Sequence, residues 1–415
     1  MTGRAILLRA NALNMPLADE SVDLIVTSPP YFALRSYQDG GEHYDGQIGA
    51  EATPGEFVDA LIAATCEMIR VLKPTGSIFV NLGDKYAGNG GGGAGSSDGV
   101  LGRGPRPASR ASTVRPKSLI GVPWRYALRC IDDLELILRA EIIWAKPNGL
   151  PESVTDRVSR KHEQWFHFTK QERYYANIDA IREQYAPASM AIYSSGNAGR
   201  CIDPAHPSAA NRGQTGDLDG WTGNPLGKVP GSWWNVPTQG LRVPPELGVD
   251  HFAAFPVEWP RRLILGWSPS GICVECGEGR RVTTTTAPAR EMAWREVQGN
   301  KRDGTNGLGG SSLGVPAVER ERTVTGEACA CVTSDAPTKP AVVLDPFGGT
   351  GTTAAVAKAL GRTGISIDLS ADYLRLADWR TNGDGYDKIH AKIHPTTKRT
   401  RAVPKQAETL FGGEA

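Results

Sequence analysis

At 415 residues, with 40% hydrophobic side chains and a formal net charge of +1, the chain is long enough for one large α/β domain with insertions, or for two domains. It contains no run of about 18 apolar residues, so no transmembrane helix is expected. Its start, MTGRAILLRANAL, lacks the charged beginning, apolar centre and small-residue cleavage site of a signal peptide, and we expect a cytoplasmic protein. Because the net charge is close to zero, any attraction to nucleic acid must come from local basic clusters.

The first part of the sequence predicts a strand that ends in a proline-rich turn. We expect short strands at Ala5–Leu8 and Asp23–Val26. The second strand is followed by Ser28, Pro29, Pro30 and Tyr31. Sites in open α/β sheets lie at the carboxyl ends of strands, and two prolines fix φ and remove two N–H donors, so their carbonyls point in a set direction. Taken alone, the segment is also compatible with a plain Pro-Pro turn after a strand.

A helix, a strand and a basic loop are expected next. Apolar residues at helical spacing predict a helix over Phe57–Leu72, and a turn leads from it into a strand at Ser77–Asn81. Residues 87–116 then change character, with a glycine-rich run followed by an arginine-rich one. The basic residues, which have no acid among them, are Arg103, Arg106, Arg110, Arg115 and Lys117. We predict a loop that contacts nucleic-acid phosphates and orders on binding; a solvated linker is the alternative.

The middle of the chain combines further sheet elements with a loop-rich region. A helix is expected to begin within Pro123–Leu128, with strands inside Leu134–Trp144 and at Gln164–Thr169. Residues 185–249 are rich in Gly, Pro, Ser and Asn and have little periodicity. The tryptophans of this region are Trp221, Trp233 and Trp234, and its arginine and lysine residues are Arg200, Arg212, Lys228 and Arg242. These residue types suit the recognition of a nucleic acid, and a loop-rich structural insertion is the alternative.

Four of the seven cysteines form two close pairs within one long connection. Residues 268–340 separate the apolar segment Val257–Leu265 from the next predicted strand, which is too long for an ordinary loop. The paired cysteines are Cys273, Cys276, Cys329 and Cys331. Four thiolates from two close pairs can close a tetrahedral zinc site with no open position, so we predict a structural zinc ion rather than a catalytic one. Four unrelated thiols are the alternative.

Residues 341–380 predict a βαβ unit with a glycine-rich turn. Ala341–Leu344 has the length and β-branched content of a buried parallel strand, and a second strand is expected at Gly364–Ile367. Between them come the turn residues Asp345, Pro346, Phe347, Gly348, Gly349, Thr350, Gly351 and Thr352, and then a helix that ends at Gly361. An acid at the tip of the second strand, here Asp368, has the right position to hold a nucleoside ribose. An ordinary βαβ unit is the alternative.

The C-terminal part predicts one more helix and a basic tail. The helix is expected at Tyr373–Trp379, and the tail covers residues 386–415. The tail contains Lys392, Lys398, Arg399 and Arg401 without an acid among them. We predict a mobile segment that contacts nucleic-acid phosphates, with a solvated tail as an equal alternative.

The glycine-rich turn, Asp-Pro-Phe-Gly-Gly-Thr-Gly, resembles the S-adenosylmethionine-binding motif of amino-methylating DNA methyltransferases. That family also carries a (Asn/Asp/Ser)-Pro-Pro-(Tyr/Phe) motif, which residues 28–31 match, and Ile143–Asn148 and His251–Pro256 are similar to further family segments. The catalytic strand precedes the cofactor strand, an order that resembles the beta class of these enzymes. The resemblance implies an α/β fold with a circularly permuted Rossmann-like methyltransferase sheet and a loop-rich target-recognition insertion. The small zinc-binding insertion is predicted from the cysteine pairs alone, because the resemblance does not cover it.

The resemblance also implies roles for the residues of both motifs. Residues 28–31 form the catalytic motif: Ser28 and Pro29 would accept hydrogen bonds from a base amino group, and Tyr31 would stack on a base taken out of the duplex. The residues expected to hold S-adenosylmethionine are Asp345, Pro346, Phe347, Gly349, Gly351, Thr352, Asp368, Asn11, Phe255 and Pro256. Asn11 stands where related enzymes often carry an acid that contacts the cofactor adenine.

The expected organisation divides the methyltransferase domain into two halves. The ranges are 1–185 for the catalytic half with the basic loop 87–117, 186–250 for target recognition, 251–267 and 340–385 for the cofactor half, 268–339 for the zinc-knuckle-like insertion, and 386–415 for the tail.

The resemblance implies methylation of double-stranded DNA. Thr-Ser-Pro-Pro-Tyr is more typical of cytosine-N4 methylation, with adenine-N6 as the alternative, followed by RNA or protein-glutamine methylation and a non-catalytic DNA-binding module. A restriction endonuclease is a further candidate partner, and we expect a monomer or a homodimer.

Overall fold

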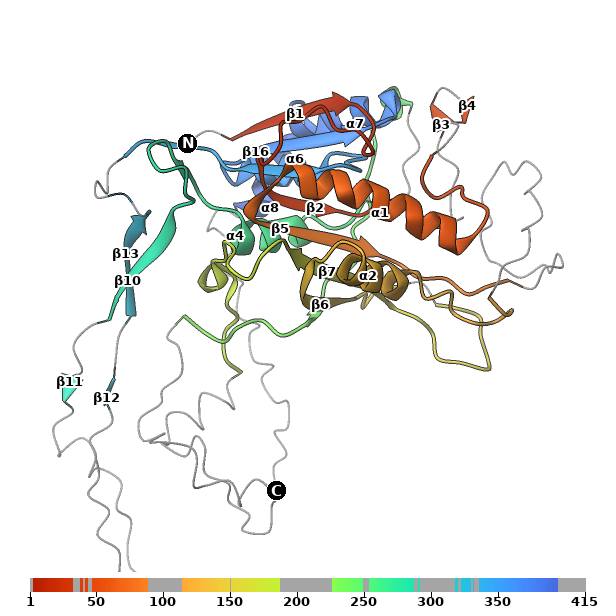
Figure 1. Ribbon diagram of the computed structural model, residues 1–415, viewed down its shortest axis with the longest axis horizontal. Coiled ribbons are helices and arrows are strands. Elements are labelled where there is room, and N and C mark those ends of the chain that lie inside the picture. Colours follow the sequence, from red (N-terminus) through yellow and green to blue (C-terminus); the bar gives the residue numbers. More distant parts are fainter. Residues whose placement is uncertain are drawn as a thin grey trace, which may run out of the picture.

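An eight-stranded sheet in the order β1-β16-β15-β2-β5-β7-β6-β8 forms the centre of the computed structural model (Figure 1). The structure describes residues 3–32, 38–39, 42–43, 47–88, 114–149, 151–186, 226–248, 254–286, 290–291, 318–319, 322–329, 331 and 336–394. The strands of the sheet are β1 (Arg4–Arg9), β16 (Thr363–Asp368), β15 (Val342–Asp345), β2 (Val22–Thr27), β5 (Leu72–Leu82), β7 (His162–Thr169), β6 (Ile137–Ala145) and β8 (Trp233–Asn235).

The order of the strands brings the two sequence motifs together. Strands β1, β16, β15, β2 and β5 run parallel, β7 is antiparallel to both of its neighbours, and β8 is parallel to β6. The chain builds β1, β2 and β5 first and later returns to insert β15 and β16 between β1 and β2. The proline-rich turn after β2 and the glycine-rich turn after β15 therefore follow neighbouring parallel strands, at the same edge of the sheet.

Helices cover both faces of the sheet, as the apolar content of its central strands predicts. All six side chains of β2 are buried; Ile25 points into one core cluster, whereas Leu24 and Val26 point into the other. The first cluster is closed by α1 (Pro54–Val71) and α2 (Val122–Asp132). The second is closed by α4 (Glu258–Trp267), α6 (Thr352–Ala359) and α8 (Gly385–Ile393), and α7 (Ala371–Thr381) packs beside α6, α8 and β1.

Shorter elements lie outside the main sheet. They are the 3-10 helices η1 (Ile178–Ile181) and η3 (Pro245–Leu247) and the antiparallel pairs β3 (Gln38–Asp39) with β4 (Glu42–His43), β9 (Ile272–Cys273) with β14 (Thr338–Lys339), β10 (Arg281–Thr286) with β13 (Arg322–Ala328), and β11 (Arg290–Glu291) with β12 (Val318–Glu319). Among the helices that the structure describes, none combines the length and the apolarity needed to cross a bilayer.

Two segments differ from the sequence-based expectation. The region expected to serve target recognition contributes β8, an edge strand of the main sheet, in which Trp234 is 3% exposed and stacks on Trp259 at 4.9 Å between ring centroids. For Trp234 the alternative role, as part of a structural insertion, is therefore the one observed, because its ring is buried in the core. The segment expected to begin a mobile tail at residue 386 instead forms α8, whose Ile389 and Ile393 are buried. Two isoleucines four residues apart gave this helix an apolar face.

Candidate active site

The proline-rich turn belongs to a hydrogen-bonded network at the carboxyl end of β2. Ser28 Oγ donates to Asn81 Oδ1 at 3.3 Å. Tyr31 OH lies 2.9 Å from the same oxygen and 2.7 Å from Glu163 Oε2, and its single hydrogen can serve one of them at a time. Ser28 and Tyr31 are thus held by residues of the next two strands, β5 and β7.

Asn81 is fixed in one orientation by its own contacts. Its side chain is almost completely buried, and its Nδ2 donates to the Gln164 carbonyl at 3.0 Å. Because the amide nitrogen is used in this way, Oδ1 must face Ser28 and Tyr31 as an acceptor. Ser28 consequently directs its hydroxyl hydrogen toward Asn81, and the lone pairs of Ser28 Oγ stay available to a donor on the opposite side.

Glu163 joins the network to a lysine. Its Oε1 accepts a hydrogen bond from Lys146 Nζ, and both side chains are mostly buried. The ammonium group also lies 4.3 Å from the centroid of the Trp144 ring. Lys146 follows β6, so four strands of the sheet contribute to one polar cluster beside the proline-rich turn.

Tyr31 has a close neighbour that constrains where its ring can lie. A Cβ added to Gly83 would come within 2.6 Å of Tyr31 Cε2, so the ring packs directly on the glycine backbone. A side chain at position 83 would force the ring to move.

The glycine-rich turn approaches the tip of β16 closely. A Cβ on Gly348 would lie 1.8 Å from Ser366 Oγ, which only glycine avoids. Gly349 and Gly351 have φ values of +49° and +71°, in the left-handed region that glycine adopts at little cost. The Gly349 N–H donates to Asp368 Oδ2 at 2.8 Å, which ties the turn to the acid at the tip of β16.

Asp345 faces the interior of the turn. Its Oδ1 accepts from Thr27 Oγ1 at 2.6 Å and from the Phe347 N–H at 3.2 Å, and its Oδ2 accepts from Thr353 Oγ1 at 2.9 Å. Burial raises the pKa of Asp345 to about 6, while the hydrogen bonds to its carboxylate oppose that shift. Through Thr27 and Thr353, this residue connects β2, the glycine-rich turn and α6; its contact with a cofactor stays a prediction.

A buried arginine supports the same turn from α7. Arg380 is 4% exposed, and its Nη1 donates to the Thr350 carbonyl at 2.9 Å, to Thr352 Oγ1 at 2.8 Å and to Thr350 Oγ1. Burial lowers the pKa of the guanidinium to about 10, so it still carries its charge near neutral pH. The Thr352 hydroxyl, which we expected to face a cofactor, is an acceptor for this arginine.

The other predicted cofactor residues occupy different surroundings. Asn11 is exposed just after β1, and its Oδ1 accepts from the Leu13 N–H at 2.9 Å. Phe255 packs edge-on against Trp165 at 5.7 Å between centroids, and Pro256 is buried. Pro346 is also buried, and Phe347 is partly buried against the core cluster of α1. Asn11 therefore follows β1, the neighbour of the strand β16 that ends in Asp368, whereas Phe255 approaches the core beneath β7.

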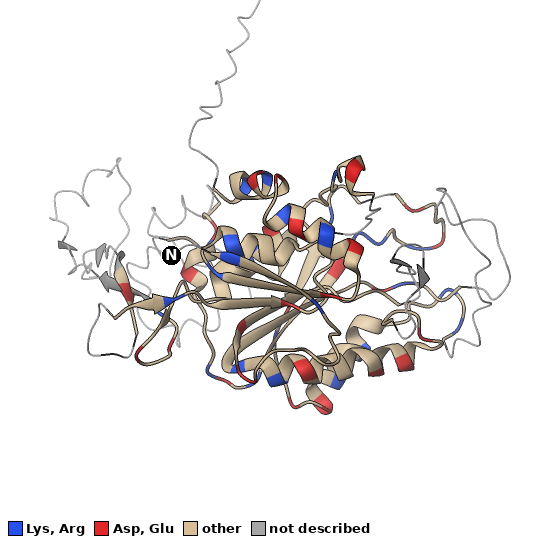
Figure 2. Cartoon of the chain, turned by 90° about the horizontal axis from the view of Figure 1, so that it is seen from above, with Lys and Arg blue, Asp and Glu red and all other residues tan. Residues whose placement is uncertain are grey.

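The predicted DNA contacts are only partly within the described residues. Arg103, Arg106 and Arg110 lie outside them, as do Arg200, Arg212, Trp221, Lys398, Arg399 and Arg401. Arg115 is exposed, and the exposed Lys117 forms an ion pair with Asp156 at 2.8 Å. Figure 2 shows basic and acidic residues interspersed along the helices that cover the sheet. The positive charge of Lys117 is thus paired with the carboxylate of Asp156. Contact of these basic residues with DNA stays a prediction.

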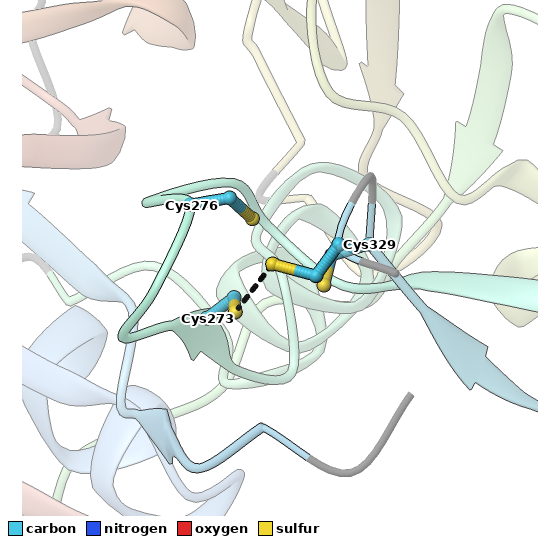
Figure 3. Close-up of side chains that lie close together, drawn as sticks. Cys273, Cys276 and Cys329 are labelled. Atoms are coloured by element: carbon cyan, nitrogen blue, oxygen red, sulfur yellow. Dashed lines mark hydrogen bonds between the residues drawn. The ribbon is translucent and has the colours of Figure 1, made fainter. Parts of the chain in front are cut away.

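The four paired cysteines come together in the structure. Their sulfur atoms all lie within 4.8 Å of one another, and Cys273 Sγ is 3.6 Å from Cys331 Sγ. Figure 3 shows Cys273, Cys276 and Cys329 pointing toward a common centre from two separate segments of the chain.

Sequence reasoning did not single out Asn81, Glu163, Lys146 or Arg380. Asn81 ends the predicted strand Ser77–Asn81, Lys146 lies in the segment Ile143–Asn148, and Glu163 directly precedes the predicted strand Gln164–Thr169. A polar residue at either end of a predicted strand is the signal that these three share. Arg380 carried no such signal, since an arginine near the end of a helix is usually exposed.

Comparison with known proteins adds a family match. A family model described as a DNA methylase matches residues 22–274 and 335–378. The chain is 41% identical over 190 residues to the Type II methyltransferase M.Cfr9I of Citrobacter freundii, covering 43% of this chain and 59% of that protein. It is 39% identical over 176 residues to the Type II methyltransferase M.SmaI of Serratia marcescens, covering 42% and 58%. The matched segments thus span a little over half the length of these relatives.

Among solved structures, the PvuII DNA methyltransferase (cytosine-N4-specific) aligns with 95% of this chain and 93% of its own, at 16% sequence identity and a TM-score of 0.49.

Proposed function

The chain belongs to the DNA methylase family of amino-methyltransferases, and from this premise we propose that it methylates the exocyclic amino group of a base in double-stranded DNA. The methyl donor would be S-adenosylmethionine, which supplies an electrophilic methyl group when bound. The observation that carries the proposal is the orientation of Ser28 by Asn81 at the edge of the sheet where the glycine-rich turn also lies.

The glycine-rich turn fits a nucleoside cofactor. A Cβ on Gly349 would meet a single backbone oxygen, that of Phe347, at 4.0 Å, so the turn leaves room for a ligand to approach its backbone. Asp368 stands at the tip of the adjacent strand with its carboxylate already oriented by the Gly349 and Ser370 N–H groups. In this proposal Asp368 binds the ribose hydroxyls, and Asn11, which lies just after the neighbouring strand β1, faces the adenine.

Ser28 and Pro29 would activate the base. An exocyclic amino nitrogen is a poor nucleophile because its lone pair is delocalised into the ring. Since Ser28 Oγ donates its hydrogen to Asn81, it can accept a hydrogen bond from one amino N–H, and the Pro29 carbonyl can accept from the other. Two acceptors placed in this way favour a pyramidal nitrogen whose lone pair is aimed at the methyl group. Catalysis would then be mostly positioning of the reacting atoms.

Tyr31 would hold the base after it leaves the duplex. Its ring packs on Gly83, and its hydroxyl is anchored by Asn81 and Glu163, so one ring face is fixed by the protein and the ring is already oriented. Base extrusion followed by stacking on an aromatic ring is the general solution for chemistry on a base within a duplex.

We infer that cytosine N4 is the methylated position, with adenine N6 as the alternative, because the turn reads Thr-Ser-Pro-Pro-Tyr rather than Asp-Pro-Pro-Tyr. The relatives' designation as Type II methyltransferases favours a role beside a restriction endonuclease. The chain order, with β2 before β15 although the two are adjacent in the sheet, supports the circularly permuted arrangement.

The test is incubation of the purified protein with labelled S-adenosylmethionine and mixed-sequence duplex DNA, followed by nucleoside analysis by mass. We expect N4-methylcytosine. N6-methyladenine would retain the mechanism and overturn the base assignment. If the protein binds the cofactor but methylates no DNA base, the DNA substrate is wrong, and RNA and protein substrates would be tried next.

Asn81→Leu tests the activation step. We expect kcat to fall about tenfold or more, which corresponds to roughly 1.4 kcal/mol of lost transition-state stabilisation, because the Ser28 hydrogen is no longer held away from the base. The affinity for S-adenosylmethionine, measured by calorimetry, should stay unchanged, since the side chain of Asn81 hydrogen-bonds to Ser28, Tyr31 and Gln164 within the described residues, none of which belongs to the glycine-rich turn. An equal loss of cofactor affinity would mean that the substitution disturbs the whole site.

A further inference from the structure

The cysteine cluster, which the methylation proposal does not use, has the geometry of a metal site. The four ligand atoms come from two segments: Cys273 ends β9 and Cys276 lies in the turn that follows, and Cys329 and Cys331 follow β13. In a tetrahedral site with Zn–S bonds of about 2.3 Å, neighbouring sulfurs stand about 3.8 Å apart. The distance of 3.6 Å between Cys273 and Cys331, and the limit of 4.8 Å for all pairs, fit one ion at the centre.

The first cysteine pair lies in a knuckle-like turn. The Gly277 N–H donates to the Cys273 carbonyl at 3.0 Å, and the Cys273 N–H donates to the Glu278 carbonyl at 2.9 Å. Gly277 has a φ of +73°, which lets the chain reverse directly after Cys276. The reversal turns both sulfurs toward the second pair, as Figure 3 shows for Cys273 and Cys276.

Other uses of four close thiols fit the geometry less well. A disulfide requires sulfurs about 2.05 Å apart, and these cysteines are all free. A cluster of several metal atoms would need its thiolates farther apart in order to enclose them. A catalytic metal keeps one position open for substrate, whereas here four protein ligands would fill a tetrahedral shell.

The location of the cluster gives it a structural purpose. Strand β9, which contains Cys273, pairs with β14, and β14 leads within three residues into β15, the strand before the glycine-rich turn. The Val274 N–H donates to the Pro337 carbonyl at 3.0 Å, and Arg280 Nη2 donates to the Ala336 carbonyl at 2.5 Å. The β10–β13 pair leaves the sheet from this point, as Figure 1 shows.

We propose that Cys273, Cys276, Cys329 and Cys331 bind one structural Zn²⁺ that fastens the insertion of residues 268–340 to the methyltransferase sheet. The ion would close the chain between the two cysteine pairs into a loop anchored beside β15. It would thereby hold the ends of β10 and β13 in register. It would also restrict the motion of the long insertion relative to β15, the strand before the glycine-rich turn.

The first test is the metal content of the full chain, purified under reducing conditions and measured by mass spectrometry of its elements. We expect about one zinc per chain. The Cys273→Ser/Cys276→Ser double variant should retain less than a tenth of that amount, because it removes two of four ligands. Cys66→Ser, which changes an exposed cysteine outside the cluster, should retain the wild-type amount.

A second measurement covers the case in which the double variant fails to fold. Zinc is removed from the wild-type protein by a chelator and replaced with Co²⁺, whose visible spectrum is intense only in tetrahedral thiolate sites. We expect that spectrum, and faster proteolysis within residues 268–340 of the metal-free protein. Wild-type protein that contains no zinc and takes up no Co²⁺, or that holds these cysteines as disulfides in a thiol titration, would overturn the proposal. None of these readouts depends on methylation.

Discussion

At the scale of single residues, the site depends on polar groups that the interior of the protein holds in fixed orientations. Ser28 is oriented by Asn81, and Asn81 by the Gln164 carbonyl, so a chain of two hydrogen bonds determines the direction in which Ser28 points its hydroxyl hydrogen. Asp345 uses both carboxylate oxygens in the same manner within the turn. Because the Asp345 carboxylate is buried, its ionisation is unfavourable in the folded protein, and the free energy of unfolding should therefore depend on pH.

Asp345 should make the protein less stable as the pH rises. Its pKa is about 6 in the folded protein, against 3.8 as the ordinary value, so the folded state binds this proton more tightly. The stabilisation is complete below pH 3.8 and is lost as the pH rises through about 6. Relative to Asp345→Asn, the wild-type free energy of unfolding should therefore fall by up to about 3 kcal/mol between pH 4 and pH 7.

Urea denaturation of both proteins across this pH range measures the difference. The asparagine can still accept from Thr27 and from the Phe347 N–H, and the Thr353 hydroxyl can turn its hydrogen to the Val26 carbonyl. The variant should therefore fold. Parallel pH profiles for the two proteins would show that Asp345 is ionised in the folded state throughout the range.

At the scale of elements, the sheet was predictable because its strands have strong signals. The apolar runs at β2 and β15 and the helical spacing in α1 each predicted one element, and the two motifs fixed which strand ends must meet. Strand β8 was missed because three residues with two tryptophans in a glycine- and proline-rich region have no periodicity to detect. Its place in the sheet depends on contacts with β6, which are distant in sequence.

The side chains between the elements were harder to predict than the motifs. Nothing local in the sequence indicates that Arg380 turns inward from α7 to hold Thr350 and Thr352, because the three become neighbours only when the βαβ unit has folded. Likewise, Lys146 and Glu163 meet because β6 and β7 pair antiparallel. The sequence motifs indicated the two turns of the candidate site, and the structure added the buried side chains that hold those turns in place.

Arg380→Met should weaken cofactor binding without changing the chemistry. The substitution removes the donors that hold Thr350 and Thr352, so the glycine-rich turn becomes looser before a ligand binds. We expect the dissociation constant for S-adenosylmethionine to rise about tenfold, roughly the 1.4 kcal/mol of one charge-assisted hydrogen bond. The kcat at saturating cofactor should stay close to that of the wild type.

The matched control for this change lies on the same helix. Arg375 is mostly exposed and forms an ion pair with Asp372, so Arg375→Met removes an equal side chain without touching the turn. Calorimetric titration should give it the wild-type affinity. If Arg380→Met folds and binds the cofactor as the wild type does, the turn keeps its shape without the arginine and the supporting role is wrong.

At the scale of the whole molecule, the chain completes its core late. Helix α8 closes the core cluster that α4 and α6 share, so residues close to the C-terminus cover one face of a sheet begun at residue 4. The expected tail therefore begins with a helix that belongs to the core, and its basic residues Lys398, Arg399 and Arg401 come after that helix.

Two truncations separate these parts. Ending the chain after residue 384 removes Ile389 and Ile393 from the core, and burial of two such side chains contributes about 3–6 kcal/mol to the free energy of unfolding. We expect that protein to be destabilised by this amount or to aggregate. Ending the chain after residue 394 keeps α8 and should leave the urea midpoint unchanged.

The protein that ends at residue 394 lacks Lys398, Arg399 and Arg401, so its DNA binding, measured at several salt concentrations, should be weaker and less salt-dependent than that of the full chain. An unchanged salt dependence would show that the residues after α8 do not contact phosphates, while an altered midpoint would show that they contribute to the fold.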